Sequence, residues 1–505
     1  MKKTLLHLLL LFLSLPAVGH QKYWVFFDHK PAGSVPAISQ TTLTNRAATG
    51  LPLWQYTDLP VDTVYVRIIK DKLQDQRPVI LSRWLNALTV SLTAQELTII
   101  RELSFVKKVR PVRRSFYIAG EAEDGNSGAA YALSQIGASE LKSADLNGEG
   151  VTVGVIDAGF YKADRKKELE HLFENNRILG VRDYLDPARK TMYRPLMSAF
   201  DAHGTHVLEN IAGSKKNGSR IGAAPGVSFY LARTDHGSAE TKLEEDYWIA
   251  ALEWMDSLGV RLVNSSLGYA DGFDDPAEDH LPEELDGETL PVTLAAQIAA
   301  DEKGILIIAS AGNEGDRDWK VLSAPADAPS VMAVGACGLA GDRMPFSSIG
   351  MEENGIKPEV CCFSNSGTSF SAPVITGLAA CLMQYNNTLT GPEVKTIIEK
   401  SGTLYPYGNN YIGYGVPSVA RAIQLADGAE IDHAAEMIEI DSDQYAISPD
   451  WIGDEAVVIF EKSDAIHVTS QNVRRTAGEP LTLFRKEAVA YTTVLAGNKV
   501  LEIKW

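Results

Sequence analysis

The stretch of sequence that decides the fold is Ser366-Gly-Thr-Ser-Phe-Ser-Ala-Pro373, which leads directly into the apolar run 374–380. A proline is tolerated in a helix only in the first turn, where the backbone N–H groups have no partner within the helix. Pro373 therefore predicts a helix that begins close to Ser369. We expect the serine hydroxyl to be exposed there, beside the positive end of the helix dipole, which suits attack on a carbonyl carbon. Taken alone, the same pattern is also that of an ordinary serine N-cap.

Residues 131–428 alternate apolar strands with helical patterns. Apolar stretches of strand length occur at 151–157, 227–232, 262–266, 305–309 and 331–334, with helical patterns at 247–258 and 290–303. Strands that are apolar throughout and alternate with helices indicate a parallel sheet covered on both faces. In such sheets the functional residues lie just beyond the carboxyl ends of the strands, and Asp157 ends the first of these strands.

Short motifs at these strand ends supply the groups that a reactive serine needs. Asp157 stands in Val-Ile-Asp-Ala-Gly, His203 in Ala-His-Gly-Thr-His, and Asn313 in Ser-Ala-Gly-Asn-Glu-Gly. Acyl transfer requires a nucleophile, a base that takes its proton, an anion that orients the base, and donors for the oxyanion. Ser369, His203, Asp157 and Asn313 provide one candidate for each of these roles.

The aspartate, histidine and serine motifs occur in the chain order Asp, His, Ser, which is the order in subtilisin. On the basis of these motifs, residues 131–428 resemble the subtilisin-like serine proteases. The resemblance implies that Asp157, His203 and Ser369 form a catalytic triad. It also implies that the Asn313 side-chain amide and the Ser369 backbone N–H bind the oxyanion. The expected activity is that of a serine endopeptidase, which hydrolyses protein or peptide substrates through an acyl-enzyme intermediate and requires no cofactor for the chemistry.

The same resemblance assigns substrate-binding residues. Ser266, Leu267 and Gly268 should offer a backbone edge that pairs with an extended substrate, which is how such enzymes bind peptides of varied sequence. Ala311 and Gly312 should help to wall the pocket for the residue before the scissile bond. A glycine there leaves room for a large side chain, and we expect an apolar one.

The first residues of the chain are typical of a secretory signal. Lys2 and Lys3 precede the apolar run 5–15, and small residues follow up to Gly19. A positive start, a short apolar centre and a small-residue end predict a signal peptide over residues 1–19. The protein is therefore expected to be exported to the periplasm, the cell surface or the medium.

Residues 20–119 form an α+β unit that resembles the inhibitor and chaperone propeptides found before this fold, so we expect a zymogen. Strands are expected at 22–27, 63–69 and 106–112, a helix or strand within 78–92, and a capped helix from Thr93. Residues 120–130 are polar and glycine-rich, as linkers are. Maturation could use another protease at Arg113-Arg114 or self-cleavage in the linker.

Residues 429–505 change to strand-like patterns, as at 456–460 and 499–503, and predict a small β domain. The predicted fold class is thus α/β, a subtilisin-like parallel sheet flanked by helices, with the α+β propeptide before it and the β domain after it. The catalytic unit spans residues 131–428.

Composition narrows the choice of partners. The 505 residues carry a formal net charge of -18, which argues against nonspecific nucleic-acid binding. No internal run of apolar residues reaches the length of a membrane span.

The acidic insertion at 271–279 raises the question of a metal. Clustered carboxylates could hold a structural calcium ion, although their spacing matches no calcium loop and a solvated surface loop is favoured. His203 and His206 share the spacing of a zinc motif, but no further ligand set accompanies them, so the metal content stays unknown.

The four cysteines, Cys337, Cys361, Cys362 and Cys381, are too few for a disulfide scaffold. Adjacent Cys361 and Cys362 are not expected to pair with each other. A bridge from Cys337 to one of them is possible, and buried free thiols are at least as plausible. The pair lies close to Ser369 in sequence, so redox control of activity is a further alternative to a structural role.

A second function class remains open. A noncatalytic binding or surface protein could be built on the same fold, although a complete set of triad residues together with Asn313 argues against it. A zinc hydrolase is a third class, and it lacks a ligand set.

Overall fold

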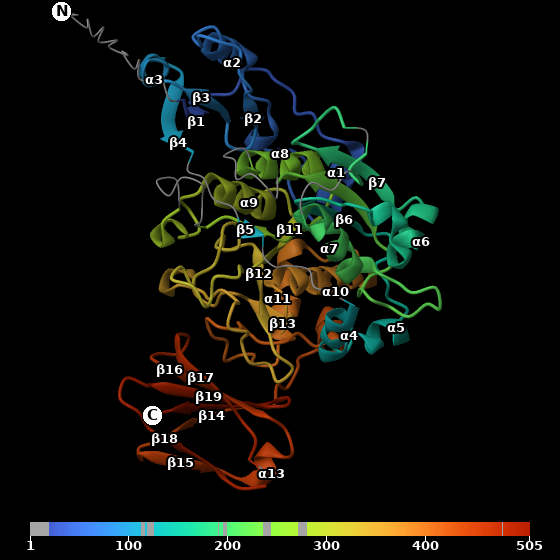
Figure 1. The fold of residues 1–505 in the computed structure, drawn as a ribbon, viewed down its shortest axis with the longest axis vertical. Coiled ribbons are helices and arrows are strands. Elements are labelled where there is room, and N and C mark those ends of the chain that lie inside the picture. The colour runs from blue at the N-terminus through green and yellow to red at the C-terminus, as the bar shows by residue number, and fades with distance from the viewer. Residues whose placement is uncertain are drawn as a thin grey trace, which may run out of the picture.

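The computed structural model describes residues 20–112, 117–118, 126–189, 191–194, 199–235, 244–270, 280–476 and 478–505. Three units follow one another along the long axis of the molecule (Figure 1): an N-terminal sheet, a large central sheet covered by helices, and C-terminal sheets. The predicted signal peptide and the acidic insertion lie outside the described residues. Within the described residues, no helix is both long and apolar enough to cross a membrane.

The N-terminal unit is a four-stranded antiparallel sheet in the order β2-β3-β1-β4, with helices on it. Its elements are β1 (Gln21–Phe27), α1 (Gln40–Ala48), α2 (Thr63–Lys70), β2 (Ile80–Ser82), β3 (Ala87–Leu92), α3 (Ala94–Arg101) and β4 (Val106–Pro111). The predicted helix from Thr93 is confirmed as α3. A reciprocal capping box begins it, because the Thr93 hydroxyl accepts from the Glu96 N–H and the Glu96 carboxylate accepts from the Thr93 N–H.

The strand predicted at 63–69 is wrong, because this segment is helix α2. Its β-branched residues favour a strand, but its two buried residues, Val66 and Ile69, are three positions apart and so lie on one face of a helix. The Asp62 carboxylate caps the helix by accepting from the Val64 N–H at 2.8 Å. Packing of this face against the sheet overrides the strand propensity of the residues.

The central sheet has seven parallel strands in the order β13-β12-β11-β9-β6-β8-β7, which confirms the predicted α/β class. The strands are β6 (Thr152–Asp157), β7 (Ile178–Asp183), β8 (Ser228–Arg233), β9 (Leu262–Ser265), β11 (Leu306–Ser310), β12 (Met332–Cys337) and β13 (Val360–Phe363). The helices are α4 (Asn126–Gln135), α5 (Ser139–Ser143), α6 (Glu170–Glu174), α7 (His203–Ala212), α8 (Glu244–Ser257), α9 (Pro291–Asp301), α10 (Ala372–Tyr385), α11 (Gly391–Lys400) and α12 (Val419–Ala426).

Both faces of this sheet are buried, as its continuous apolar strands predict. Val155 of β6 belongs to a core cluster that includes Ile211 of α7 and Leu378 of α10. The next residue, Ile156, belongs to a second cluster on the other face, with Leu252 of α8. Successive side chains of a strand point to opposite faces, so each strand joins two cores.

The C-terminal unit confirms the predicted β domain. Its five-stranded sheet has the order β14-β20-β19-β16-β17, and β15 pairs with β18 beside it. The elements are β14 (Ala435–Glu439), β15 (Gln444–Ile447), α13 (Pro449–Ile452), β16 (Val457–Lys462), β17 (Val468–Arg474), β18 (Leu481–Phe484), β19 (Tyr491–Ala496) and β20 (Lys499–Lys504). Phe460 belongs to the core cluster of the central unit, whereas its neighbour Ile459 belongs to the C-terminal unit's own core. The sheet therefore uses one face to pack against the catalytic unit.

All four cysteines are buried free thiols. Burial raises the pKa of the Cys361 and Cys362 thiols well above their usual value and that of Cys381 to about 12. The Cys362 thiol donates a hydrogen bond to the Ser371 carbonyl at 3.4 Å. These surroundings favour a structural role over redox control, because the reactive species of a cysteine is the thiolate.

Replacement of a side chain that joins the C-terminal sheet to the catalytic unit should destabilise the protein. Phe460→Ala empties a fully buried position, and such cavities cost about 3–5 kcal/mol of unfolding free energy. Denaturant unfolding of the full chain measures this loss. The matched control Phe484→Ala alters a ring that is 62% exposed, and it should change stability by about 0.5 kcal/mol or less.

Titration with a thiol reagent should separate structural from reactive cysteines. The folded protein should react at none of its four cysteines within the time that the denatured chain needs to react at all of them, because every thiol is buried. Fast labelling of Cys361 or Cys362 in the folded protein would contradict a purely structural role and would support redox control of activity.

Candidate active site

Asp157 and His203 meet at the carboxyl end of β6. The imidazole Nδ1 of His203 lies 2.9 Å from Asp157 Oδ1, and both side chains are buried. Because a carboxylate can only accept, Nδ1 carries the proton, and Nε2 is left as the basic nitrogen. The Ala158 N–H donates to the same carboxylate oxygen at 2.8 Å and fixes its orientation.

Glycines allow this close approach of α7 to β6. A Cβ at Gly204 would lie 2.6 Å from the Gly159 carbonyl oxygen and 2.9 Å from Asp157 Oδ1. The Gly204 N–H donates to that same Gly159 carbonyl at 2.8 Å. Gly204 therefore lets the first turn of α7 pack against the carboxyl end of β6. This packing places His203 within hydrogen-bond distance of Asp157.

Ser369 lies in a 3₁₀ turn, Thr368–Phe370, directly before α10, and Pro373 lies in the first turn of that helix, as predicted. The expectation that its hydroxyl is exposed is wrong, because Ser369 is completely buried. The hydroxyl donates to the backbone carbonyl of Ser266 at 3.1 Å, and the Ser266 hydroxyl donates back to the Ser369 carbonyl at 3.1 Å.

The catalytic histidine candidate has one free nitrogen. His203 Nε2 is buried and has no hydrogen-bond partner among the described residues. The ring of Phe370, the residue after the serine, packs against the imidazole with centroids 5.5 Å apart. The serine hydroxyl is thus turned toward Ser266 in this state, and catalytic hydrogen bonds are often loose before substrate binds.

Asn313 is held by the residue before the serine. Its side-chain Oδ1 accepts from the Thr368 N–H at 2.9 Å and from the Thr368 hydroxyl at 3.0 Å. These two bonds fix the amide so that its NH₂ group is the free donor end. Sequence reasoning missed Thr368, since a threonine between glycine and serine carries no signal of its own.

The predicted substrate edge is paired in the structure. Strand β10 (Leu267–Gly268) forms an antiparallel pair with β5 (Tyr117–Ile118), the continuation of the N-terminal unit. Leu267 lies opposite Ile118, and Gly268 lies opposite Tyr117. A segment of the chain therefore occupies the edge that is predicted to bind substrate, and the substrate-binding role of this edge stays a prediction.

Ala311 and Gly312 follow β11, in the loop that carries Asn313, and both are buried. Gly312 has φ +114°, and a Cβ there would lie 2.7 Å from the Ser348 hydroxyl oxygen, so the loop needs a glycine. The Gly312 N–H lies 3.2 Å from the Thr368 hydroxyl, which ties this loop to the serine turn. Their part in the substrate pocket stays a prediction.

A second buried carboxylate lies near the site. Asp235 follows β8, and its carboxylate accepts from the Tyr269 hydroxyl at 3.4 Å. Burial raises the pKa of Asp235 to about 7 despite a hydrogen bond from Thr234, and the charge of Asp157 contributes to the rise. Below this pKa Asp235 is mostly protonated and adds little negative charge near Asp157, and it gains its charge as the pH rises through about 7.

The described residues contain no group of three or more histidine, cysteine or acidic side chains able to hold a metal ion. His206, considered above as a zinc ligand, pairs through Nδ1 with the Glu209 carboxylate at 3.0 Å. The calcium prediction for residues 271–279 lies outside the described part of the chain.

Comparison with known proteins agrees with this geometry. Residues 148–415 match the subtilase family model, and residues 22–124 match the model of the peptidase S8 propeptide domain of Bacteroidota. Subtilisin NAT of Bacillus subtilis subsp. natto is 28% identical over 306 residues, which cover 58% of this chain and 71% of the relative. The major intracellular serine protease of Bacillus subtilis is 25% identical over 317 residues, 59% of this chain and 90% of the relative.

A solved structure shares the fold. Fervidolysin from Fervidobacterium pennivorans, a keratinolytic enzyme related to subtilisin, superposes with a TM-score of 0.54 at 16% identity, covering 94% of this chain and 71% of fervidolysin. The family match covers more than half of the 505 residues. The chain belongs to the subtilase family and is a subtilisin-like serine endopeptidase with an N-terminal propeptide domain.

Proposed function

We propose that this zymogen hydrolyses peptide bonds through a triad of Asp157, His203 and Ser369, by way of an acyl-enzyme intermediate. The observation that carries the proposal is the buried hydrogen bond from His203 Nδ1 to Asp157, which leaves Nε2 as a free base. A serine hydroxyl is a weak nucleophile unless a base takes its proton as it attacks. The Asp157 carboxylate holds the imidazole in the required tautomer and stabilises the imidazolium that forms.

The oxyanion of the tetrahedral intermediate needs donors that are fixed before the reaction starts. We assign this role to the Asn313 NH₂ group and the Ser369 backbone N–H. Support for Asn313 comes from its two hydrogen bonds with Thr368, which hold the amide in one orientation without a contribution from substrate. Preorganised donors of this kind contribute about a hundred- to a thousandfold in rate each, on the scale known for subtilisin, a relative of this chain.

The substrate is proposed to be an extended protein or peptide chain that pairs with Ser266, Leu267 and Gly268. The pairing of β5 with β10 supports this, because β5 is itself an extended segment on that edge. The propeptide then acts as an intramolecular inhibitor by occupying the place of the substrate. Ala311 and Gly312 are proposed to border the pocket for the residue before the scissile bond.

The reaction uses only side chains and water, so we propose that no cofactor takes part in it. A structural calcium ion is compatible with this proposal. Export of the protein to the periplasm, the cell surface or the medium is proposed from the signal-peptide pattern of residues 1–19.

Ser369→Ala should abolish hydrolysis of peptide substrates and labelling by a fluorophosphonate probe. Loss of the nucleophile costs about a million-fold in rate in subtilisin, and we expect the same scale here. Circular dichroism should be unchanged, because among the described residues the lost hydroxyl donates one hydrogen bond, to the Ser266 carbonyl. Full activity of the variant would overturn the triad. Absence of probe labelling in the matured wild-type chain would favour the noncatalytic alternative.

The pairing register of β5 predicts where the propeptide is cut. In this antiparallel pair the residue numbers of partners have a constant sum, so a substrate strand in the same register presents the residue after Ile118 to Ser266, whose carbonyl contacts the Ser369 hydroxyl. We therefore expect cleavage between Ala119 and Gly120. N-terminal sequencing of the mature protein should begin at Gly120, and the Ser369→Ala chain should remain uncut. A mature terminus directly after Arg113 or Arg114 would indicate another protease.

A further inference from the structure

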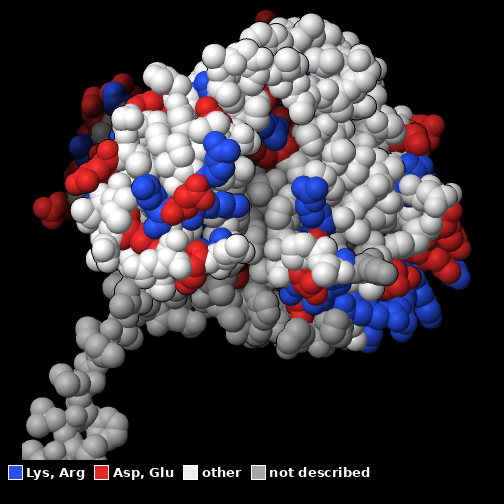
Figure 2. All heavy atoms as spheres, turned by 90° about the horizontal axis from the view of Figure 1, so that it is seen from above, with Lys and Arg blue, Asp and Glu red and all other residues white. Residues whose placement is uncertain are grey.

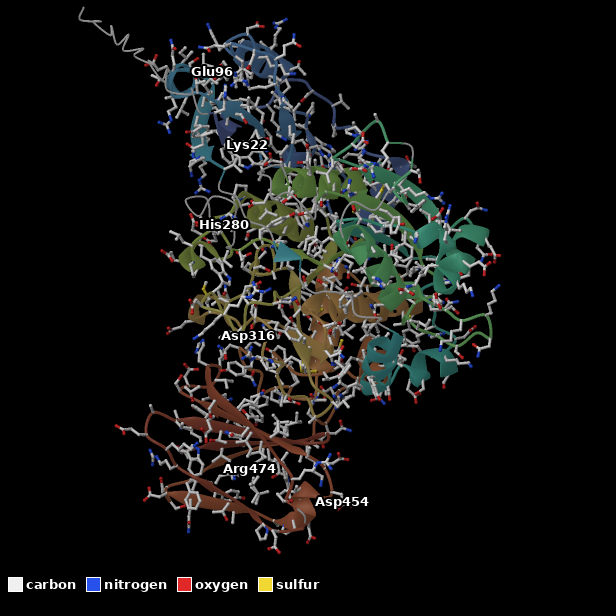
Figure 3. The ribbon with its side chains drawn as sticks, viewed as in Figure 1. Lys22, Glu96, His280, Asp316, Asp454 and Arg474 are labelled. Carbon is white, nitrogen blue, oxygen red and sulfur yellow. The ribbon has the colours of Figure 1, made fainter. Side chains whose placement is uncertain are left out.

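The propeptide contacts the catalytic unit at more places than the active site. Its sheet rests on α8, and Lys22 lies at the side of the sheet that faces α8 (Figure 3). Lys22 pairs with Asp246 of α8, and the Arg83 guanidinium lies 2.6 Å from the Asp256 carboxylate. Acidic and basic side chains lie interspersed on the outer face of this end of the molecule (Figure 2). Of the charges that join the two units, Lys22, Asp246 and Asp256 are buried, and Arg83 is partly exposed.

A separate part of the propeptide, residues 39–58, leaves the sheet between β1 and α2 and contains α1 and the 3₁₀ turn Tyr56–Asp58. We call it the arm. The arm contacts the carboxyl-terminal ends of α8 and α9, which precede the amino ends of β9 and β11. Functional residues lie at the carboxyl ends of these strands, so the arm docks at the opposite edge of the same sheet from the active site.

Side chains of the arm satisfy backbone carbonyls at these two helix ends. Thr42 donates to the Asp256 carbonyl at 2.8 Å and Asn45 to the Gly259 carbonyl at 2.7 Å. Gln55 donates to the Glu302 carbonyl at 3.0 Å. The last carbonyls of a helix have no partner within the helix, and the arm brings hydrogen-bond donors to both helix ends; the Asp256 carbonyl also accepts from the Gly259 N–H at 3.0 Å.

A buried ionic network joins the arm to both helix ends. The Arg46 guanidinium contacts the Asp58 carboxylate at 2.7 and 3.1 Å and the Asp256 carboxylate at 3.1 Å. The Lys303 ammonium lies 3.0 Å from Asp58. These four side chains are at most 5% exposed. Removal of one partner from such a network leaves a buried charge uncompensated, which is strongly destabilising.

The network holds its charges over a wide pH range. Burial by itself raises the pKa of Asp58, but hydrogen bonds from Arg46 and Lys303 outweigh burial and lower it to about 2. Arg46 belongs to the arm itself, so only the part of this lowering that comes from Lys303 acts across the contact; that part stabilises docking above the usual carboxyl pKa of about 4 and is lost as pH falls toward the lowered value.

Two glycines of the catalytic unit make room for the arm. A Cβ at Gly259 would lie 2.7 Å from Thr41 Cγ2, and one at Gly304 would lie 2.5 Å from Leu51 Cδ1. Both have positive φ, as glycines after helix ends commonly do, and the arm fills the space that they leave. The remaining cavity at this contact is about 10 Å³, room for about one water molecule.

We propose that the arm is a second docking element that keeps the propeptide bound to the catalytic unit after the linker is cut. The inference rests on the proposed function, since it assumes that the propeptide is cut from an active enzyme. Two linked contacts hold more tightly than either alone, because release of one leaves the other in place for rebinding. Self-cleavage at the linker therefore leaves an inactive complex of the cut propeptide with the catalytic unit. Activity appears when the arm dissociates and the propeptide is released.

The test compares variants of the full chain in which only the catalytic side of the contact is altered. Lys303→Met removes the ammonium that pairs with Asp58, and Gly259→Asn keeps a residue that tolerates positive φ while placing a side chain against Thr41. The matched controls are Lys142→Met, at an exposed lysine of α5, and Gly218→Asn, at a glycine with φ +79° and open space around it.

After self-processing, the propeptide should co-elute with the wild-type and control catalytic units in size-exclusion chromatography. It should dissociate about tenfold faster or more from the Lys303→Met and Gly259→Asn chains, and hydrolysis of a peptide substrate should begin correspondingly earlier. Once free of propeptide, the variants should match wild type in kcat/KM, because both positions lie at the far edge of the sheet. Equal release rates in variants and controls would overturn the proposal.

A second measurement does not depend on catalysis. In Ser369→Ala precursors, hydrogen exchange of the backbone amides of residues 40–48 should be faster with Lys303→Met than with Lys142→Met, since docking protects α1. Equal hydrogen-exchange protection of residues 40–48 in the two chains would contradict docking by the arm, even if the protease proved inactive. If the chain that keeps Ser369 is not labelled by the fluorophosphonate probe while α1 stays protected, the proposed function is refuted and the docking contact is retained.

Discussion

Every parallel strand of a sheet must end at the same edge, and this constraint organises the molecule. Asp157 ends β6, Ser266 follows β9, and Asn313 follows β11, three strands that are adjacent in the order β11-β9-β6. The sheet order therefore brings residues that are far apart in sequence to one place. Only His203 and Ser369 come from helix starts, and both are drawn to the same edge by glycines and short turns that permit close approach.

The same constraint creates a second edge, where the strands begin. Helices α8 and α9 run back along the sheet and end there, and their terminal carbonyls need partners. The propeptide reaches both edges: β5 lies on β10 beside the active site, and the arm covers the two helix ends. In the proposed scheme, inhibition of the enzyme depends on the contact of β5 with β10, and retention of the propeptide depends also on the arm. A substitution can therefore change one of these contacts and leave the other intact.

The sequence predicted the parts of the site that carry a local signal. Asp157, His203, Asn313 and Ser369 each stand beside a strand or helix boundary marked by apolar runs, glycine or proline. Helix α2 was missed because β-branched composition outweighed the three-residue spacing of Val66 and Ile69. Burial of Ser369, the register of β5 on β10 and the arm were beyond prediction, because each depends on contacts between segments more than a hundred residues apart in the chain. Thr368 carried no signal at all.

The Ser266 carbonyl links substrate binding to activation of the serine. In the structure this carbonyl accepts the Ser369 hydroxyl, while His203 Nε2 has no partner among the described residues. A substrate that extends along Ser266, Leu267 and Gly268 brings backbone N–H donors to this edge. We propose that a substrate N–H bonded to the Ser266 carbonyl displaces the serine hydroxyl from it, so that the hydroxyl can turn toward His203 Nε2, its proposed base. Pairing of β5 with Leu267 and Gly268 leaves the serine on the Ser266 carbonyl, so in this proposal it is contact with Ser266 itself that couples recognition of an extended chain to the chemical step.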